Sequence, residues 1–189
     1  LIVRAIPEII HSGLGYRPSP WLNSFPRYSV AYLERIGAFR NCNVILERKP
    51  DPDFDIQKWR AGGRQIRVRA SSVEAEPKDI YNYWANHRGM NDPYDGIQMS
   101  EYDGWKGSHH LADYHFLIDA VKKISQDPKY KGKKLVPYTV AMYNGKEAID
   151  FLKVLFEYGH YQACERYLPE ESSMEKAKTA LHWMNWIIA

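Results

Sequence analysis

The sequence lacks the local patterns that mark several common kinds of functional site. Its two cysteines, Cys42 and Cys164, lie far apart, so they form neither a metal-spaced pair nor a disulfide framework. The histidines show no HxH or HExxH spacing, and no phosphate-binding loop, nucleophile elbow or dinucleotide-binding glycine pattern occurs. Functional residues must therefore be sought among side chains that are scattered along the chain.

Long apolar runs and charge of a single sign are also missing. No uninterrupted apolar run reaches the ~18 residues that a membrane-spanning helix needs, and the first residues lack the order of a signal peptide. The 26 basic and 23 acidic residues are spread along the chain and leave a formal charge of +3. We therefore expect neither a membrane nor a nucleic-acid partner, and we interpret the basic cluster at 129–134 as a solvated loop. The sequence does not indicate a cellular location.

The composition is that of a globular protein. With 189 residues, of which 44% are hydrophobic, the chain can bury a substantial core and is expected to form one domain over 1–189. It is rich in aromatic residues, with 14 tyrosines and 6 tryptophans. Most of these are expected in the core and at its rim, but five fall in loops after expected strands: Tyr16, Trp21, Tyr102, Trp105 and Tyr143. The last four of these are candidates for substrate binding.

The stretch from Asp95 to Trp105 predicts a buried strand that ends in acidic and aromatic residues. An Asp-Gly turn opens it, Ile97 and Met99 share one face, and Gln98 lies on the other. A helical pattern follows over 109–125, so strand, polar loop and helix form one α/β unit. The same order recurs along the chain. Strands are expected at 7–13, 43–50, 65–70, 97–100, 135–143 and 161–169. For 161–169, a continuation of the preceding helix is the alternative. Helices are expected at 26–37, 51–60, 72–89, 109–125, 148–156 and 173–188.

These six units predict a parallel (β/α) barrel, complete or incomplete. An eightfold barrel of ~250 residues uses roughly 31 residues per unit, so six units need about 186 residues. Gln65, Arg67 and Arg69 alternate strictly with Ile66, Val68 and Ala70. A barrel strand can direct polar groups into the lumen, whereas a central strand of a doubly wound sheet should be apolar on both faces. The doubly wound sheet remains the alternative, and a chain segment beyond Ala189, or another chain, is expected to complete a partial barrel.

Polar side chains gather at the ends of the expected strands, which lie on one rim in parallel α/β folds. They are His11, Glu47, Arg69, Glu101, Tyr143 and Glu165. Three carboxylates in corresponding places indicate acid-base chemistry, so Glu101, Glu165 and Glu47 are the catalytic candidates. His11 and Arg69 join the aromatic loop residues as candidates for substrate binding. Paired carboxylates flanked by arginine and aromatic residues are what glycoside hydrolysis requires.

The chain resembles the (β/α)-barrel glycoside hydrolases, through Glu101 at the end of the fourth strand and the acidic, aromatic stretch 164–170. The resemblance is architectural and implies a carbohydrate-active hydrolase without a cofactor, in which Glu101 is the general acid/base. Ser100 stands where the largest clan of these enzymes has Asn, and the strand that carries their nucleophile is not among the six.

Two other functions fit the same residues. A noncatalytic carbohydrate-binding barrel would use the aromatic residues without a complete acid pair. A metal-dependent α/β hydrolase would bring His11, Glu47 and Glu101 together on a divalent ion.

Overall fold

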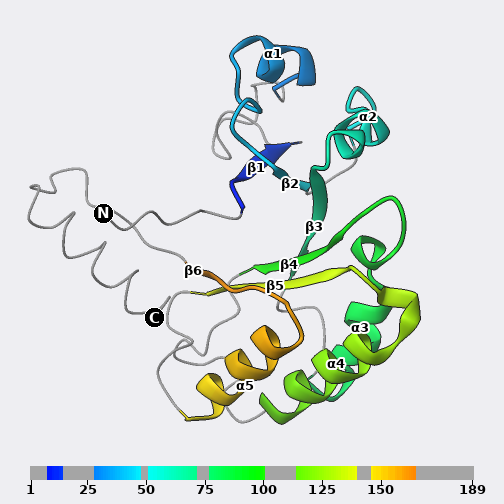
Figure 1. Cartoon of the computed structure of the whole chain (residues 1–189), viewed down its shortest axis with the longest axis vertical. Helices are drawn as coiled ribbons and strands as arrows, with labels where there is room; N and C mark the ends of the chain where they lie inside the picture. Colours follow the sequence, from blue (N-terminus) through cyan, green and yellow to red (C-terminus); the bar gives the residue numbers. More distant parts are fainter. Residues whose placement is uncertain are drawn as a thin grey trace, which may run out of the picture.

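The computed structural model describes residues 8–14, 28–47, 51–71, 77–100, 114–139 and 146–164. Strands and helices alternate along the chain, as the sequence predicts (Figure 1). The strands are β1 (Ile10–Leu14), β2 (Val44–Glu47), β3 (Gln65–Ser71), β4 (Gly96–Ser100), β5 (Lys134–Thr139) and β6 (Ala163–Cys164). The helices are α1 (Val30–Arg35), α2 (Ile56–Ala61), α3 (Ile80–Asn86), α4 (Tyr114–Gln126) and α5 (Lys146–Glu157).

All the strands are parallel, and each pairs with the next one along the chain. The first five form a continuous sheet that curls into a half-barrel, and the two-residue β6 adds to the free side of β5. This strictly sequential order contradicts the doubly wound alternative, in which the order reverses at a switch point. The closed form of the barrel is not present among the described residues, because β1 and β6 remain the two edges of the sheet. The fold is thus a partial parallel barrel.

The two faces of β3 differ as its alternating sequence predicts. Ile66 and Ala70 belong to the two apolar clusters that the helices cover, whereas Arg67 lies on the opposite, concave face and is fully buried. The neighbouring strands have the same apolar and polar faces, because Ile66 pairs in register with Ile45 and Arg69 pairs with Gln98. The described helices that contribute to these clusters therefore pack on one face of the sheet, which supports the barrel interpretation.

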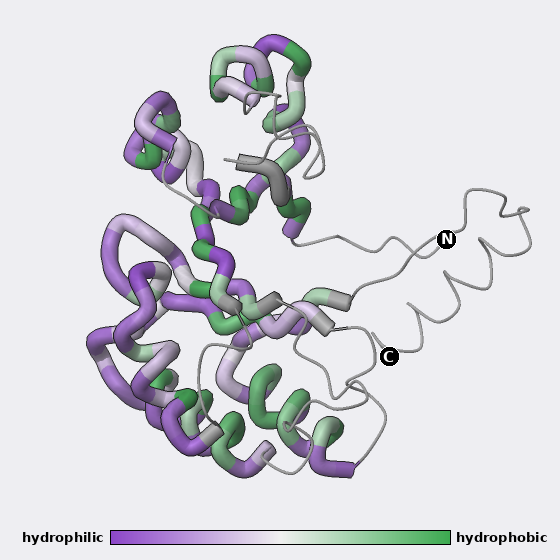
Figure 2. Tube along the Cα trace, turned by 180° about the vertical axis from the view of Figure 1, so that it is seen from behind, coloured by the Kyte–Doolittle hydropathy of each residue, from purple (hydrophilic) through white to green (hydrophobic). Residues whose placement is uncertain are grey.

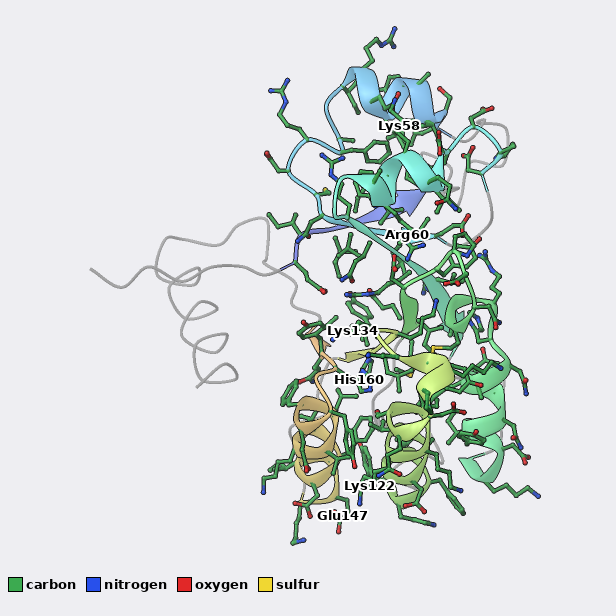
Figure 3. All side chains as sticks on the ribbon, turned by 45° about the vertical axis from the view of Figure 1, so that its right-hand side comes forward. Lys58, Arg60, Lys122, Lys134, Glu147 and His160 are labelled. Carbon is green, nitrogen blue, oxygen red and sulfur yellow. The ribbon has the colours of Figure 1, made fainter. Side chains whose placement is uncertain are left out.

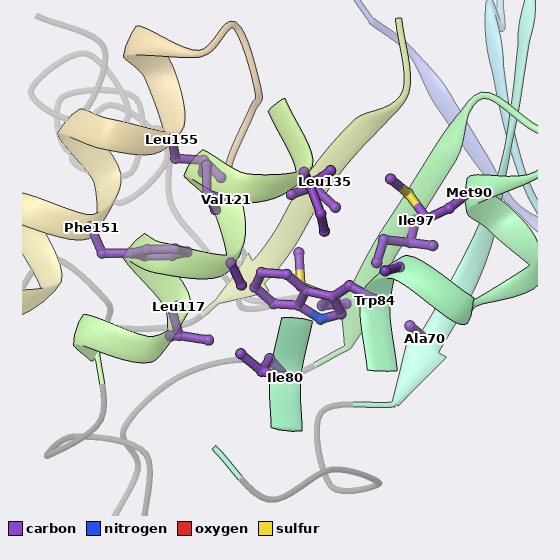
Figure 4. Packing of buried hydrophobic residues seen from close by; sticks show 14 of the residues in the cluster. Ala70, Ile80, Trp84, Met90, Ile97, Leu117, Val121, Leu135, Phe151 and Leu155 are labelled. Carbon is purple, nitrogen blue, oxygen red and sulfur yellow. The ribbon is translucent and has the colours of Figure 1, made fainter. Parts of the chain in front are cut away.

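The larger apolar cluster fills the space between β3–β5 and the helices α3, α4 and α5, which lie side by side (Figure 1). Trp84 of α3 lies at its centre, near Ile80, Leu117 and Val121, and none of its surface is exposed (Figure 4). Hydrophobic and hydrophilic residues alternate along these helices (Figure 2), so each helix has one apolar side for the core. The 3.6-residue periodicity of the sequence predicts the same sides.

A smaller cluster joins α1 and α2 to β2 and β3, and Phe39 and Trp59 are its largest members. Trp59 Nε1 donates a hydrogen bond of 2.8 Å to the backbone oxygen of Gln65, which ties α2 to the start of β3. Both helices begin later than their sequence patterns predict. Ser29 and Asp55 are the N-caps, and their side chains accept from the N–H groups of the first turn.

The Asp95-Gly96 pair joins the neighbouring strands at the amino end of β4. The backbone of Asp95 accepts from Lys134 N–H and donates to Ile66 O, both at 2.8 Å. Gly96 has a φ of 143°, and a Cβ built there would lie 2.1 Å from the backbone oxygen of Lys134. Only glycine fits this position, because both the backbone conformation and the approach of β5 exclude a side chain.

Several expected elements lie outside the described residues, including the helix at 173–188, the loop after β1 and the end of the fifth strand. Of the sixth expected strand, for which a continued helix was the alternative, Ala163–Cys164 form β6, and 165–169 lie outside the described residues. Among the helices of the described ranges, none is both long enough and apolar enough to cross a membrane.

Candidate functional site on the concave face

The amino end of the concave face is closed by a buried ionic cluster. The guanidinium of Arg67 is 0% exposed and pairs with Glu8. It also donates to the side-chain oxygen of Gln65 at 2.7 Å. Tyr161 lies beside this group, with the Arg67 guanidinium carbon 5.9 Å and the Lys134 ammonium 5.0 Å from its ring centroid. In (β/α) barrels this end of the sheet serves stability, so we assign the cluster a structural role.

Arg69 of β3 and Gln98 of β4 are register partners on the concave face, nearer to the carboxyl edge of the sheet than Arg67. Gln98 is 8% exposed, and its Oε1 accepts no hydrogen bond from the described residues. The Nε of Arg67 is likewise buried without a partner in that part of the chain. A buried polar atom without a partner costs about 1–3 kcal/mol, so these two atoms require an explanation.

In the sequence, the two predicted catalytic acids directly follow strands that end at the carboxyl edge of the sheet. β4 ends at Ser100, directly before Glu101, and β6 ends at Cys164, directly before Glu165. β5 pairs with both strands, so the two ends are separated by one strand, as the sequence predicts. Glu101 and Glu165 themselves lie outside the described residues, and so do the four aromatic candidates Trp21, Tyr102, Trp105 and Tyr143.

Glu47 ends β2 as predicted, but its side chain lies on the helix-covered face. It pairs in register with Val68, which contacts the turn before β4, and it is 1% exposed. Arg88 donates to its carboxylate at 2.9 Å and to the Tyr94 hydroxyl at 2.8 Å. Burial, and then the bond to Glu47, raise the pKa of Tyr94. These contacts make Glu47 part of a structural ion pair, and no contact with a second carboxylate is found for it among the described residues. Its catalytic role stays a prediction.

His11 also lies on the helix-covered face, since it pairs in register with Ile45. Its ring packs edge-on against Phe39, with the centroids 5.1 Å apart, and burial lowers its pKa. The described histidines, cysteines and carboxylates include no group of three that could hold a metal ion. The described part of the chain therefore gives the His11–Glu47 metal site no support. Of the described binding candidates, only Arg69 lies on the concave face.

The sequence did not single out Glu8, Gln98, Lys134 or Tyr161 as site residues. Gln98 had a detectable signal, because it alternates with the apolar Ile97 and Met99 and so belongs to the polar face of its strand. The contact of Glu8 with Arg67 had none, since 59 positions separate the two residues. No protein-family model matches the chain, and no curated protein matches it either.

Proposed function

We propose that this protein is a carbohydrate-active hydrolase of the glycoside hydrolase type, in which Glu101 is the general acid/base and Glu165 is the nucleophile or base. The observation that supports this function best is the parallel, sequential order of the strands. It brings the carboxyl ends of β4 and β6 to the same edge of the sheet, with β5 between them.

The strand spacing suits a pair of catalytic carboxylates. Neighbouring strands are ~4.8 Å apart, so backbone positions two strands apart lie near 10 Å. Side chains that converge from these positions reach the separation of about 5–5.5 Å that a retaining mechanism uses, or roughly 6.5–9.5 Å for an inverting one. One acid then protonates the leaving oxygen, while the other attacks the anomeric carbon or activates water.

The concave face below this edge supplies groups that suit a polyhydroxylated ligand. Arg69 and Gln98 offer hydrogen-bond donors and an acceptor there. The aromatic candidates Trp21, Tyr102, Trp105 and Tyr143 would add flat apolar surfaces for sugar rings. In this proposal, strands outside the described residues or in another chain complete the (β/α) barrel. The open edges of β1 and β6 within the described sheet support this, because such edges tend to pair with further strands.

The test is hydrolysis of a panel of polysaccharides and oligosaccharides, measured as reducing sugar released by the wild type, Glu101→Gln and Glu165→Gln. Loss of an acid/base group lowers the rate by about 10²–10⁴-fold, so both variants should lose nearly all activity. Glu157→Gln is the matched control, because Glu157 is exposed at the end of α5. It should retain full activity.

Three outcomes would count against this function. Full activity in both variants would show that the acid pair is wrong. Binding without cleavage by the wild type would identify the protein as a noncatalytic carbohydrate-binding barrel. Activity that disappears with a chelator and returns with a divalent metal would identify a metal-dependent hydrolase instead.

A further inference from the structure

A polar pocket of about 430 Å³ lies at the amino edge of the sheet, beside the turns that lead into β4 and β5. Its volume falls within the range of roughly 300–1,000 Å³ that small-molecule sites occupy. Four of its lining residues are cationic: Arg60, Lys129, Lys131 and Lys133. The sequence places the three lysines in one loop, but Arg60 comes from α2, and only the folded chain brings it to them.

Two carboxylates also line the pocket, and each of them already binds a cation. Asp95 accepts from Arg60 Nη2 at 3.0 Å and, through its other oxygen, from Ile66 N–H at 2.9 Å. Asp92 accepts from Lys133 Nζ at 2.9 Å. Four positive and two negative side chains leave the pocket with a formal charge of +2. Stability of this end of the barrel explains the two ion pairs, but it does not explain the excess of positive charge.

The excess charge belongs to Lys129 and Lys131. Both residues are exposed, and neither has an ion-pair partner within the described ranges. The Lys129 ammonium lies 5.0 Å from the ring centroid of Tyr130, on the same short turn. Like charges gathered around one pocket repel each other, so an anion that enters between them offsets this repulsion.

Arg60 is held in a fixed place and still has hydrogen-bond donors to offer. Its Nη2 binds Asp95, whereas no partner of its Nε or Nη1 is found in the part of the chain that the structure describes. The side chain lines the pocket and is 34% exposed. A guanidinium presents five N–H donors in a planar fork that matches the oxygens of a phosphate. Asp95 therefore orients Arg60 without using the donors that a ligand needs.

A phosphate group matches this set of cations. It carries about 1.5–2 negative charges at neutral pH and three strong acceptor oxygens, whereas a carboxylate has one charge and two oxygens. We propose that Arg60, Lys129 and Lys131 bind the phosphate group of a small phosphomonoester. The pocket is larger than a phosphate group alone, and Asn91 on its wall offers polar atoms to the rest of the ligand.

This site is separate from the proposed active site. The pocket lies at the amino edge of the sheet, whereas the acid pair is predicted at the carboxyl edge. The proposal therefore concerns binding alone and does not rest on the proposed hydrolase activity.

The test is a ¹H–¹⁵N NMR titration that follows the backbone amide of Gly132, which lines the pocket. The ligands are glucose 6-phosphate and glycerol 3-phosphate, with glucose, glycerol and inorganic phosphate as comparisons. At least one phosphomonoester should shift this amide to saturation, and the unphosphorylated compounds should leave it unchanged.

The double variant Lys129→Gln/Lys131→Gln should bind that phosphomonoester at least about tenfold more weakly, because charge-assisted hydrogen bonds are lost. It keeps both ion pairs, so its urea-unfolding midpoint should stay close to that of the wild type. The matched control is Lys58→Gln/Lys122→Gln, which loses the same charge at two exposed lysines outside the pocket (Figure 3). The control should bind as the wild type does.

Several results would overturn the proposal. A silent Gly132 amide with every phosphate compound would show that the lysines are only solvated. Equal affinities of the double variant and its control would show a general attraction between charges. A response to inorganic phosphate but to neither phosphomonoester would indicate an adventitious ion only. Binding of a single-stranded oligonucleotide without binding of either phosphomonoester would identify a polyanion surface instead.

Discussion

His160 should make the stability of the protein depend on pH in the weakly acidic range. Its ring is 5% exposed between β5, α4 and α5. Nδ1 accepts from Leu135 N–H at 3.3 Å, and Nε2 lies 2.9 Å from Ser125 Oγ. Ser125 itself donates to Val121 O at 2.6 Å, so the neutral ring carries its proton on Nε2 and donates to Ser125. Lys134 and His160 lie close together where β5 begins and α5 has ended (Figure 3).

Burial, and then the nearby charge of Lys134, lower the pKa of His160 from 6.5 to about 4. The unfolded chain therefore binds a proton below pH 6.5 that the folded protein does not bind until about pH 4. The contribution to stability is complete above the unfolded value and is lost as the pH falls through this interval. The difference corresponds to about 3 kcal/mol, a large part of the roughly 5–15 kcal/mol by which a typical domain is stable.

The assay is urea unfolding between neutral pH and about pH 4, for the wild type and His160→Asn. Asparagine can still accept from Leu135 N–H, but it has no proton to gain. The stability advantage of the wild type over the variant should shrink by about 3 kcal/mol across this range. His115→Asn, at an exposed position on α4, is the control and should run parallel to the wild type. An advantage of His160 that does not change with pH would refute the reasoning.

Two further substitutions test the packing around the strands. Gly96→Ala should destabilise the protein by more than about 3 kcal/mol in chemical unfolding, because its Cβ would collide with the backbone of Lys134. Gly63→Ala shares a positive φ but meets open space, so it should cost only about 1 kcal/mol, and equal effects would contradict the argument. Arg88→Met leaves the buried carboxylate of Glu47 without its ion-pair partner and should lower the unfolding free energy by about 2 kcal/mol. An unchanged unfolding midpoint would show that Glu47 is satisfied by other groups.

The sequence alone was sufficient for the order of the elements and for the two faces of several of them. In β3, the alternation of Gln65, Arg67 and Arg69 with apolar residues predicted both the strand and its polar lumen side, and the structure confirms both. Element ends were less accurate. Helix α2 begins at Ile56, where Asp55 caps it, rather than at the expected Asp51.

The candidate site was less predictable than the fold. Glu47 was assigned to the rim because it ends a strand, but its face depends on the pairing of β2 with β3. Its partner Arg88 lies 41 positions further along the chain. The place of Arg69 beside Gln98 likewise depends on the pairing of β3 with β4.

There is a physical reason why the sequence determined some features of this protein and the tertiary structure decided others. Periodicity and capping depend on residues a few positions apart, so the sequence determined the succession of strands and helices and the polar face of β3. Ion pairs, unpaired polar atoms and the protonation of His160 depend on groups that meet only when the sheet has curled and its register is set. The Arg67–Glu8 pair, the place of Glu47 under the helices and the low pKa of His160 were therefore decided by the tertiary structure alone.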